Sequence, residues 1–180
     1  KKKEVLYVGR ISEYPKRISY VLRIWKIIES NPELSDWNLK IVGDGPDMDT
    51  SKQLSRKLSL QRVIFEGFKD PKPFYTESAI FMMTSASEGF GMTLVEAQQY
   101  GVVPVVMDTY SSLHEIIDSE RNGIIIPDND LDGYAKAVEK LMLEPAYRKQ
   151  LAENGLKTCK KFTVEHIADE WEDLFNQMKK

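Results

Sequence analysis

The segment SEGFGMTLVEAQQYG, residues 87–101, carries two glutamates, Glu88 and Glu96, that are separated by seven residues. Gly89 and Gly91 directly follow the first glutamate, and glycines let a ligand approach the backbone closely. N–H groups at the start of a helix donate to phosphate or hydroxyl oxygens. A carboxylate accepts hydrogen bonds from a polyol, so Glu88 suits a sugar, and Glu96 suits a ribose diol if its helix face turns to the ligand. The alternative is that Glu88 favours the helix dipole and that Glu96 is a surface residue.

Two basic residues, Arg10 and Lys16, follow the first apolar run of the chain. Neither the Gly-x-Gly-x-x-Gly of dinucleotide sites nor the Gly-x-x-x-x-Gly-Lys-Ser/Thr of phosphate loops stands there. Two fixed cations can neutralise a diphosphate without a glycine cradle, because arginine offers a planar fork and lysine a point charge. The alternative is a solvated pair of charges on a surface loop.

Short apolar runs are the elements that must position these residues. The predicted strands are residues 4–9, 38–43, 62–67, 79–85, 103–108 and 123–127. They are apolar nearly throughout, which is typical of strands buried on both faces, and residues at helical spacing separate them. This order predicts parallel pairing with right-handed crossovers. We therefore expect residues 1–180 to form a single doubly wound, Rossmann-like α/β domain, with a parallel sheet of about six strands and helices on both faces.

After residue 127 the pattern becomes helical, and it predicts helices over residues 131–143, 146–162 and 164–178. The last helix has an apolar stripe that includes Trp171 and Phe175, which indicates a face packed on protein. Thr163 is a fair N-cap for that helix.

Ligands of open parallel sheets bind beyond the carboxyl ends of the strands. The segments at those ends are rich in glycines and in charged or hydroxyl side chains. They read GRISEYPK, GDGP, GFKDPKPFY, ASEGFGMT and DTYSS after the first to the fifth strand. The sequence therefore predicts its ligand site at this edge of the sheet.

Composition excludes several classes of function. The net charge of −3 shows no basic excess of the kind that marks nucleic-acid binding, so we expect no nucleic-acid partner. The single cysteine, Cys159, cannot form an intrachain disulfide and stands in no metal-type spacing, which favours a reducing, cytoplasmic location and an inert helix residue. No apolar run reaches the roughly 18 residues that a membrane span needs.

Three Asp-x-Asp triplets, which begin at Asp47, Asp128 and Asp130, resemble ligands of hard cations. Each triplet stands at a predicted helix start, where aspartates cap amides and favour the dipole, so we predict no metal site. His114 and His166 each stand alone on a helical pattern, and we interpret them as ordinary helix residues.

The segments GRISEYPK, VGDGP, VIFEGF, SASEGFGMTLVEAQQYG, PVV and NGIIIP resemble, in this order and at these intervals, one known family. It is the C-terminal, donor-binding domain of retaining GT-B glycosyltransferases of family 4, also called glycosyl transferases group 1. The resemblance covers nearly the whole chain and implies one half of a GT-B fold. Such enzymes transfer a sugar, with retention, from a nucleotide diphosphate donor to an acceptor. The implied substrate is a UDP- or GDP-linked sugar, and no cofactor or metal is implied.

The resemblance also implies roles for single residues. Arg10 and Lys16 would hold the diphosphate, Glu88 the hydroxyls of the transferred sugar, and Glu96 the ribose diol. The other implied donor-binding residues are Gly9, Phe68, Gly89, Phe90, Gly91, Met92, Thr93 and Leu94. Of these, Phe68 would border the base, and Thr93 and Leu94 would offer backbone N–H groups to phosphate.

The chain departs from the family pattern at several points. Arg10 and Lys16 stand one residue further apart than in many relatives, and Arg17 replaces the usual glycine after the lysine. The chain also resembles only the donor half of a GT-B enzyme, so we expect an acceptor half to precede Lys1 and to cover the last helix. An isolated donor half is expected to bind nucleotide without transferring sugar. The implied role of the whole protein is the synthesis of cell-surface polysaccharide or glycolipid, with an acceptor at the inner membrane surface.

Two other classes of function stay open at this stage. A GT-B-fold sugar-nucleotide epimerase or a phosphorylase-like enzyme would bind a similar donor without an external sugar acceptor. A non-catalytic nucleotide-binding α/β module of flavodoxin or receiver type would carry clustered acidic residues after the first strand and a lysine after the fifth. Arg10 and Asp108 stand at those two places.

Overall fold

The computed structural model describes residues 1–178 of the chain. Six parallel strands form one sheet in the order β3-β2-β1-β4-β5-β6. The strands are β1 (Glu4–Val8), β2 (Asn38–Val42), β3 (Val63–Gly67), β4 (Ile80–Met83), β5 (Val103–Asp108) and β6 (Ile124–Pro127). Every predicted strand is confirmed, and the largest difference is at β4, which ends at Met83 instead of residue 85.

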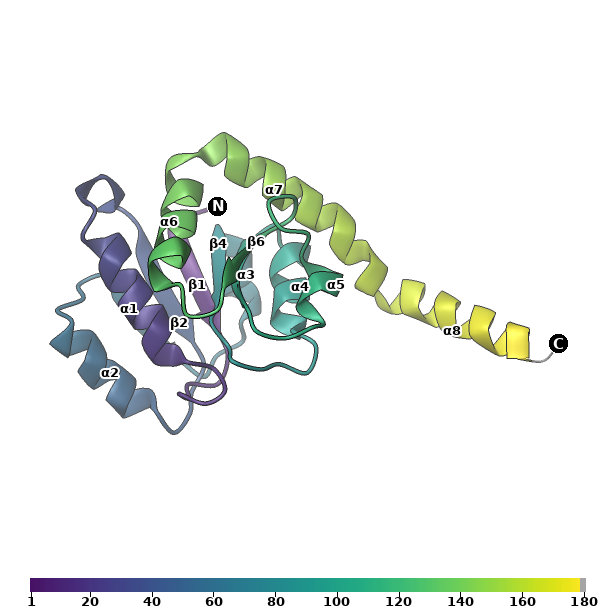
Figure 1. Cartoon of the computed structure of the whole chain (residues 1–180), viewed down its shortest axis with the longest axis horizontal. Coiled ribbons are helices and arrows are strands. Elements are labelled where there is room, and N and C mark those ends of the chain that lie inside the picture. The colour runs from purple at the N-terminus through teal and green to yellow at the C-terminus, as the bar shows by residue number, and fades with distance from the viewer. Residues whose placement is uncertain (179–180) are drawn as a thin grey trace.

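Helices cover both faces of this sheet (Figure 1). They are α1 (Ile18–Glu29), α2 (Met48–Lys57), α3 (Lys72–Glu77), α4 (Met92–Gln99), α5 (Leu113–Ile116), α6 (Leu131–Leu143), α7 (Pro145–Thr158) and α8 (Val164–Met178), with 3-10 turns η1 (Pro32–Leu34) and η2 (Cys159–Phe162). The segment predicted as one helix over residues 146–162 is therefore α7 followed by η2.

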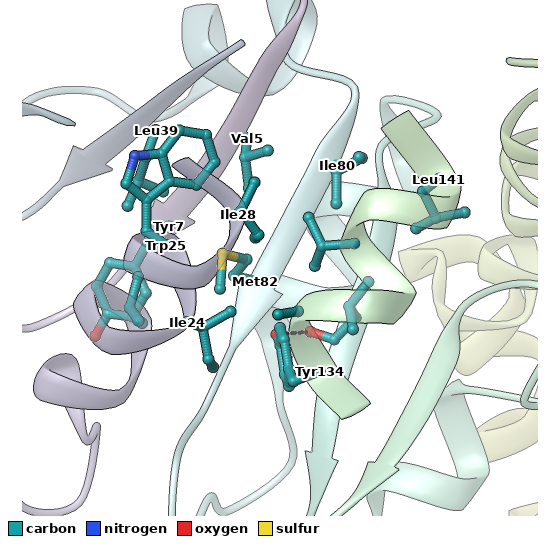
Figure 2. Packing of buried hydrophobic residues seen from close by; sticks show 14 of the residues in the cluster. Val5, Tyr7, Ile24, Trp25, Ile28, Leu39, Ile80, Met82, Tyr134 and Leu141 are labelled. Atoms are coloured by element: carbon teal, nitrogen blue, oxygen red, sulfur yellow. Dashed lines mark hydrogen bonds between the residues drawn. The ribbon is translucent and has the colours of Figure 1, made fainter. Parts of the chain in front are cut away.

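Adjacent residues of a strand point to opposite faces of the sheet, and each face has its own hydrophobic core. The strands are therefore apolar at nearly every position. Val5 belongs to the core under α1 and α6, and the next residue, Leu6, belongs to the core under α3 and α4. Figure 2 shows Trp25 of α1 in the first core, near Val5 and Leu39. The edge strand β3 is the exception to the prediction of burial on both faces, because Ile64 there is 42% exposed.

The order of the strands shows at which point of the sheet edge a ligand site is expected. The chain runs outward from β1 through β2 to β3, and then returns to place β4 on the other side of β1. Val5 of β1 is paired with Ile80 of β4. The order of strands reverses between these two, and ligands of doubly wound sheets bind at the carboxyl side of such a switch point. The loops after β1 and β4 are therefore the first place to look for a site.

The C-terminal helix α8 extends away from the sheet and its covering helices (Figure 1). None of its residues is buried, and Trp171 and Phe175 are 55% and 52% exposed. Thr163 caps the helix as predicted, since its Oγ1 accepts a hydrogen bond from the N–H of His166 at 3.3 Å. The predicted apolar stripe is present, but it does not pack on the described residues. No helix within residues 1–178 combines the length and apolarity that a membrane span requires.

Candidate functional site

The loops that follow β1 and β4 meet at the switch point. Lys16 Nζ of the first loop lies 2.6 Å from Glu88 Oε1 of the second, and their side chains are 23% and 14% exposed. Backbone contacts hold the loops together, because the N–H of Ala86 donates to the carbonyl of Pro15 at 2.7 Å. The hydroxyl of Thr84 donates to the carbonyl of Lys16 at 3.1 Å. The structure thus joins a predicted cation and a predicted carboxylate that are 72 positions apart.

Arg17, which replaces a glycine of the family pattern, has φ 51° and ψ 50° at the N-cap of α1. This left-handed conformation is one that glycine adopts freely, and other residues adopt it at a cost. The Arg17 guanidinium pairs with Asp128 and lies 5.3 Å from the centre of the Tyr20 ring. These contacts hold the Arg17 side chain against α1 and against the segment that follows β6.

Arg10 is exposed and lines a pocket of ≈ 310 Å³ formed by the loops after β1, β2 and β3. Gly9, Phe68 and Lys69 line the same pocket. The Phe68 side chain is 88% exposed, so its ring is available to a ligand. The pocket therefore combines cations that suit a diphosphate with an aromatic surface that suits a flat base.

The glycines of the GDGP segment hold the β1 loop in place. A Cβ on Gly43 would lie 1.9 Å from the carbonyl oxygen of Gly9, and one on Gly45 would lie 2.3 Å from the carbonyl oxygen of Ile11. The N–H of Ile11 donates to the carbonyl of Asp44 at 2.9 Å. The sequence pattern marked this segment as part of the edge, but the structure shows that its glycines permit contact between two loops.

Glu96 lies on the side of α4 that faces a second pocket, of ≈ 220 Å³. Its Oε2 accepts a hydrogen bond from the Tyr75 hydroxyl at 3.0 Å. Pro71 lines both this pocket and the pocket of Arg10, so the two pockets adjoin. Glu96 is half-buried and bonded to Tyr75, so it is not a fully solvated surface residue.

Gly89 and Gly91 lie in the glycine loop, the segment between β4 and α4, and their surroundings differ. Gly91 is the N-cap of α4 with φ 98°, and a Cβ there would lie 2.8 Å from the Tyr110 hydroxyl. Gly89 has open space where a Cβ would stand. The Phe90 ring packs edge-on against Phe162, with 5.5 Å between ring centres. The Phe90 ring is therefore packed on protein in this structure.

The hydrogen bonds at the start of α4 contradict the predicted contact between the Leu94 N–H and phosphate. The N–H of Leu94 already donates to the carbonyl of Gly91 at 2.9 Å, and the Leu94 side chain is fully buried. Leu94 therefore has no free N–H for phosphate in this structure. Met92 and Thr93 are the first two residues of the helix, and N–H groups at such positions lack acceptors within their own helix. These two N–H groups are the donors that a ligand would meet.

Two tyrosines near Glu88 were not identified from the sequence. The Tyr7 hydroxyl donates to the carbonyl of Arg10 at 3.1 Å. Burial, and then the negative charge of Glu88, raise the pKa of both Tyr7 and Tyr110. Both side chains therefore stay protonated at neutral pH, and their hydroxyls donate elsewhere, that of Tyr7 to the Arg10 carbonyl and that of Tyr110 to the Met83 sulfur at 3.3 Å.

The aspartate triplets have structural partners. Asp47 Oδ2 accepts from the N–H of Glu13 at 2.7 Å, and Asp130 Oδ1 caps α6 by accepting from the N–H of Gly133 at 2.8 Å. His114 does not stand alone as expected, because its Nε2 lies 2.9 Å from Asp108 Oδ1.

Cys159 is buried, and this burial raises the pKa of its thiol. A raised thiol pKa lowers the fraction of reactive thiolate, which agrees with the expectation of an inert residue.

Similarity to known proteins identifies the family of this chain. Residues 1–158 match the family described as Glycosyl transferases group 1. The amylovoran biosynthesis glycosyltransferase AmsD of Erwinia amylovora is 29% identical over 178 residues, which are 98% of this chain and 49% of AmsD. The chain thus spans about half the length of this curated relative.

Solved structures show the same fold. The structure of a Staphylococcus aureus TarM variant in complex with fondaparinux, alpha-GlcNAc-glycerol and UDP superposes with a TM-score of 0.89 at 21% identity, over 97% of this chain and 36% of TarM. The C-terminal domain of LpcC, a glycosyl transferase group 1 protein from Francisella tularensis, superposes with a TM-score of 0.80 at 21% identity, over 91% of this chain and 88% of that domain. The chain therefore belongs to the glycosyl transferases group 1 family and has the fold of the C-terminal donor domain of a GT-B glycosyltransferase.

Proposed function

We propose that this chain binds the nucleotide diphosphate part of a sugar donor at the switch-point edge of its sheet, for a retaining glycosyl transfer. One observation carries the proposal. The pocket of Arg10 and Phe68 adjoins the pocket of Glu96 at Pro71. A base, a diphosphate and a ribose diol would then each meet the kind of group that recognises it. The Lys16–Glu88 pair at the neighbouring loop offers one further charge of each sign.

The charges of this site suit the departure of a diphosphate. Breaking the anomeric bond builds oxocarbenium character on the sugar and negative charge on the leaving group. Cations that are already in place beside the phosphate stabilise that transition state more than the ground state. Arg10 would bind the diphosphate through its planar fork, and Lys16 would add a point charge.

Donor binding would also change the partner of Glu88. In this structure its carboxylate is paired with Lys16. A diphosphate that attracts Lys16 would leave Glu88 free to accept hydrogen bonds from the hydroxyls of the transferred sugar. We infer that Glu88 acts as a hydrogen-bond acceptor and not as a nucleophile. Retention would then follow from departure and attack on the same face, with the leaving phosphate taking the proton of the acceptor hydroxyl.

The relatives support a role for the whole protein in making a cell-surface polysaccharide or glycolipid. AmsD is named for amylovoran biosynthesis, and the TarM structure contains UDP, which supports a UDP-linked donor here as well. Both relatives are longer than this chain. We infer that a second half supplies the acceptor site, at the inner surface of the membrane, and covers the exposed stripe of α8.

Titration calorimetry with UDP, GDP, uridine and guanosine tests the binding step. We expect the 180-residue chain to bind one nucleoside diphosphate more tightly than its nucleoside, because Arg10 and Lys16 meet the phosphates. Equal affinity for diphosphate and nucleoside, or binding of neither, would overturn the proposal. We also expect no multiple-turnover transfer from a UDP- or GDP-sugar by this chain alone, since the acceptor site would lie in the other half.

A further inference from the structure

Tyr75 of α3 makes a direct contact with Glu96. Neither the segment of residues 87–101 nor the spacing of its two glutamates indicates this contact. Its hydroxyl donates to Glu96 Oε2 at 3.0 Å, and both residues line the pocket that adjoins the pocket of Arg10. A carboxylate has two oxygens that accept hydrogen bonds. Tyr75 occupies one of them, which leaves Oε1 for a ligand.

The packing around Tyr75 gives its hydroxyl a fixed position. The side chain is 1% exposed. Its ring is stacked on Tyr100, with 5.9 Å between ring centres and an interplanar angle of 11°, and it lies 5.9 Å from the ring of Phe81. A ring held on two sides by other aromatic rings cannot follow the carboxylate if Glu96 changes rotamer. The tyrosine therefore restrains the glutamate, rather than the reverse.

The hydroxyl also stays a donor throughout the working range of pH. Burial, and then the negative charge of Glu96, raise the pKa of Tyr75 far above neutral pH. A protonated phenol can only donate to an ionised carboxylate, so the direction of this hydrogen bond is fixed.

We propose that Tyr75 is a positioning residue for ribose recognition, which holds Glu96 Oε2 so that Oε1 faces the diol of a bound nucleotide. This inference rests on the proposed function. Without the restraint, the glutamate side chain would have to lose rotamer freedom when ligand binds, and that loss would weaken binding. The effect should appear only with a ligand that carries both ribose hydroxyls.

The test compares Tyr75→Phe with the native chain in calorimetric titrations of UDP, 2′-deoxy-UDP, GDP and 2′-deoxy-GDP. Phenylalanine keeps the aromatic stack and removes only the hydroxyl. We expect native protein to prefer a ribonucleotide over its deoxy form, and Tyr75→Phe to lower that preference by about three- to tenfold. Glu96→Gln should lower it as well, and the double variant should lose little more than the larger single loss.

Tyr134→Phe is the matched control. Tyr134 is a fully buried tyrosine whose hydroxyl bonds to the backbone of β4 and β5, in the other core (Figure 2). This control should lower the melting temperature and leave the ribose preference at its native value. If Tyr75→Phe and Tyr134→Phe change the ribose preference equally, the change is a general effect of lost stability, and the inference is overturned.

The remaining outcomes separate the inference from the proposed function. If native protein and Tyr75→Phe show the same preference while Glu96→Gln loses it, Tyr75 has no positioning role and the nucleotide site stands. If native protein binds neither UDP nor GDP, the proposed function fails, and the inference fails with it. A Tyr75→Phe variant that does not fold would assign the hydroxyl to stability and would also overturn the inference.

Discussion

The loops that leave β1 and β4 meet at one edge of the sheet, but they are packed differently. The β1 loop, residues 9–17, is held by the β2 loop, where Gly43 and Gly45 allow close contact with the carbonyls of Gly9 and Ile11. The β4 loop, residues 84–91, contains Gly89, which has open space on its Cβ side. The comparison indicates that the backbone beside Arg10 is fixed by close packing, whereas the β4 loop has room to adjust to a sugar at Gly89.

Gly43→Ala tests whether the β1 loop is the more tightly packed of the two loops. A Cβ there would lie 1.9 Å from the carbonyl oxygen of Gly9, at φ 141°, so the two loops would have to separate. We expect a loss of about 3 kcal/mol in the free energy of unfolding, measured by urea denaturation. Gly89→Ala is the matched control and should change it by less than about 0.5 kcal/mol. Equal losses for the two variants would show that the β1 loop is not more tightly packed.

Arg10→Ala should have the largest effect on binding. A charge-assisted hydrogen bond contributes about 1.5–3 kcal/mol, so affinity for the nucleoside diphosphate should fall by about 10- to 100-fold. Affinity for the nucleoside alone should change much less, and Arg10→Lys should recover part of the loss because an ammonium lacks the planar fork.

Arg121→Ala controls for the loss of a surface charge, since Arg121 is 72% exposed and pairs with Asp118 three residues away. It should leave affinity for the diphosphate unchanged. If Arg10→Ala binds nucleoside and nucleoside diphosphate with native affinity, Arg10 is a solvated loop residue, and the predicted phosphate site is in the wrong place.

Lys16 and Glu88 link the two loops, and a pair of variants tests that link. Lys16→Ala should weaken diphosphate binding by about 3- to 10-fold, less than Arg10→Ala, because Lys16 must first leave Glu88. The variant also leaves the Glu88 carboxylate unpaired near the incoming phosphates. Adding Glu88→Gln to Lys16→Ala should therefore restore about threefold in affinity. Losses that simply multiply in the double variant would show that the two side chains act independently.

Much of the fold was predictable because long apolar runs report burial directly. The strands and the helices α6 and α8 follow from such patterns; the bounds of α6 and α8 are confirmed, and those of the strands agree to within two residues. The short helices α3 and α5 were missed, because six and four residues are too few to show helical periodicity. Helical periodicity also does not show what the apolar face of a helix packs against. α1 and α8 both carry an apolar stripe, yet α1 buries residues such as Trp25, and no residue of α8 is buried.

The candidate site was predictable in its residue types but not in its contacts. The cations and carboxylates were identified by their place after strands, which the sheet topology fixes. The Lys16–Glu88 pair could not be read from the chain, because strand order sets which loops become neighbours. The left-handed backbone of Arg17 was not predicted either, because an arginine rarely adopts positive φ; the family glycine at this position was the one signal for it. Tyr75 lies on a helix that was itself missed.

A chelator should have the smallest effect, and the aspartate triplets give the reason. A bound divalent cation would need carboxylates that are free to coordinate it. Asp128 is paired with Arg17, Asp130 caps α6, and Asp47 accepts from the N–H of Glu13. Within residues 1–178, no three side chains of the metal-binding types lie close enough together to share an ion. With the diphosphate charge met by Arg10 and Lys16, EDTA should change nucleotide affinity by less than about twofold. Calorimetry with and without EDTA measures this. A tenfold or greater loss that Mg²⁺ or Mn²⁺ restores would show that a metal ion carries the phosphate charge.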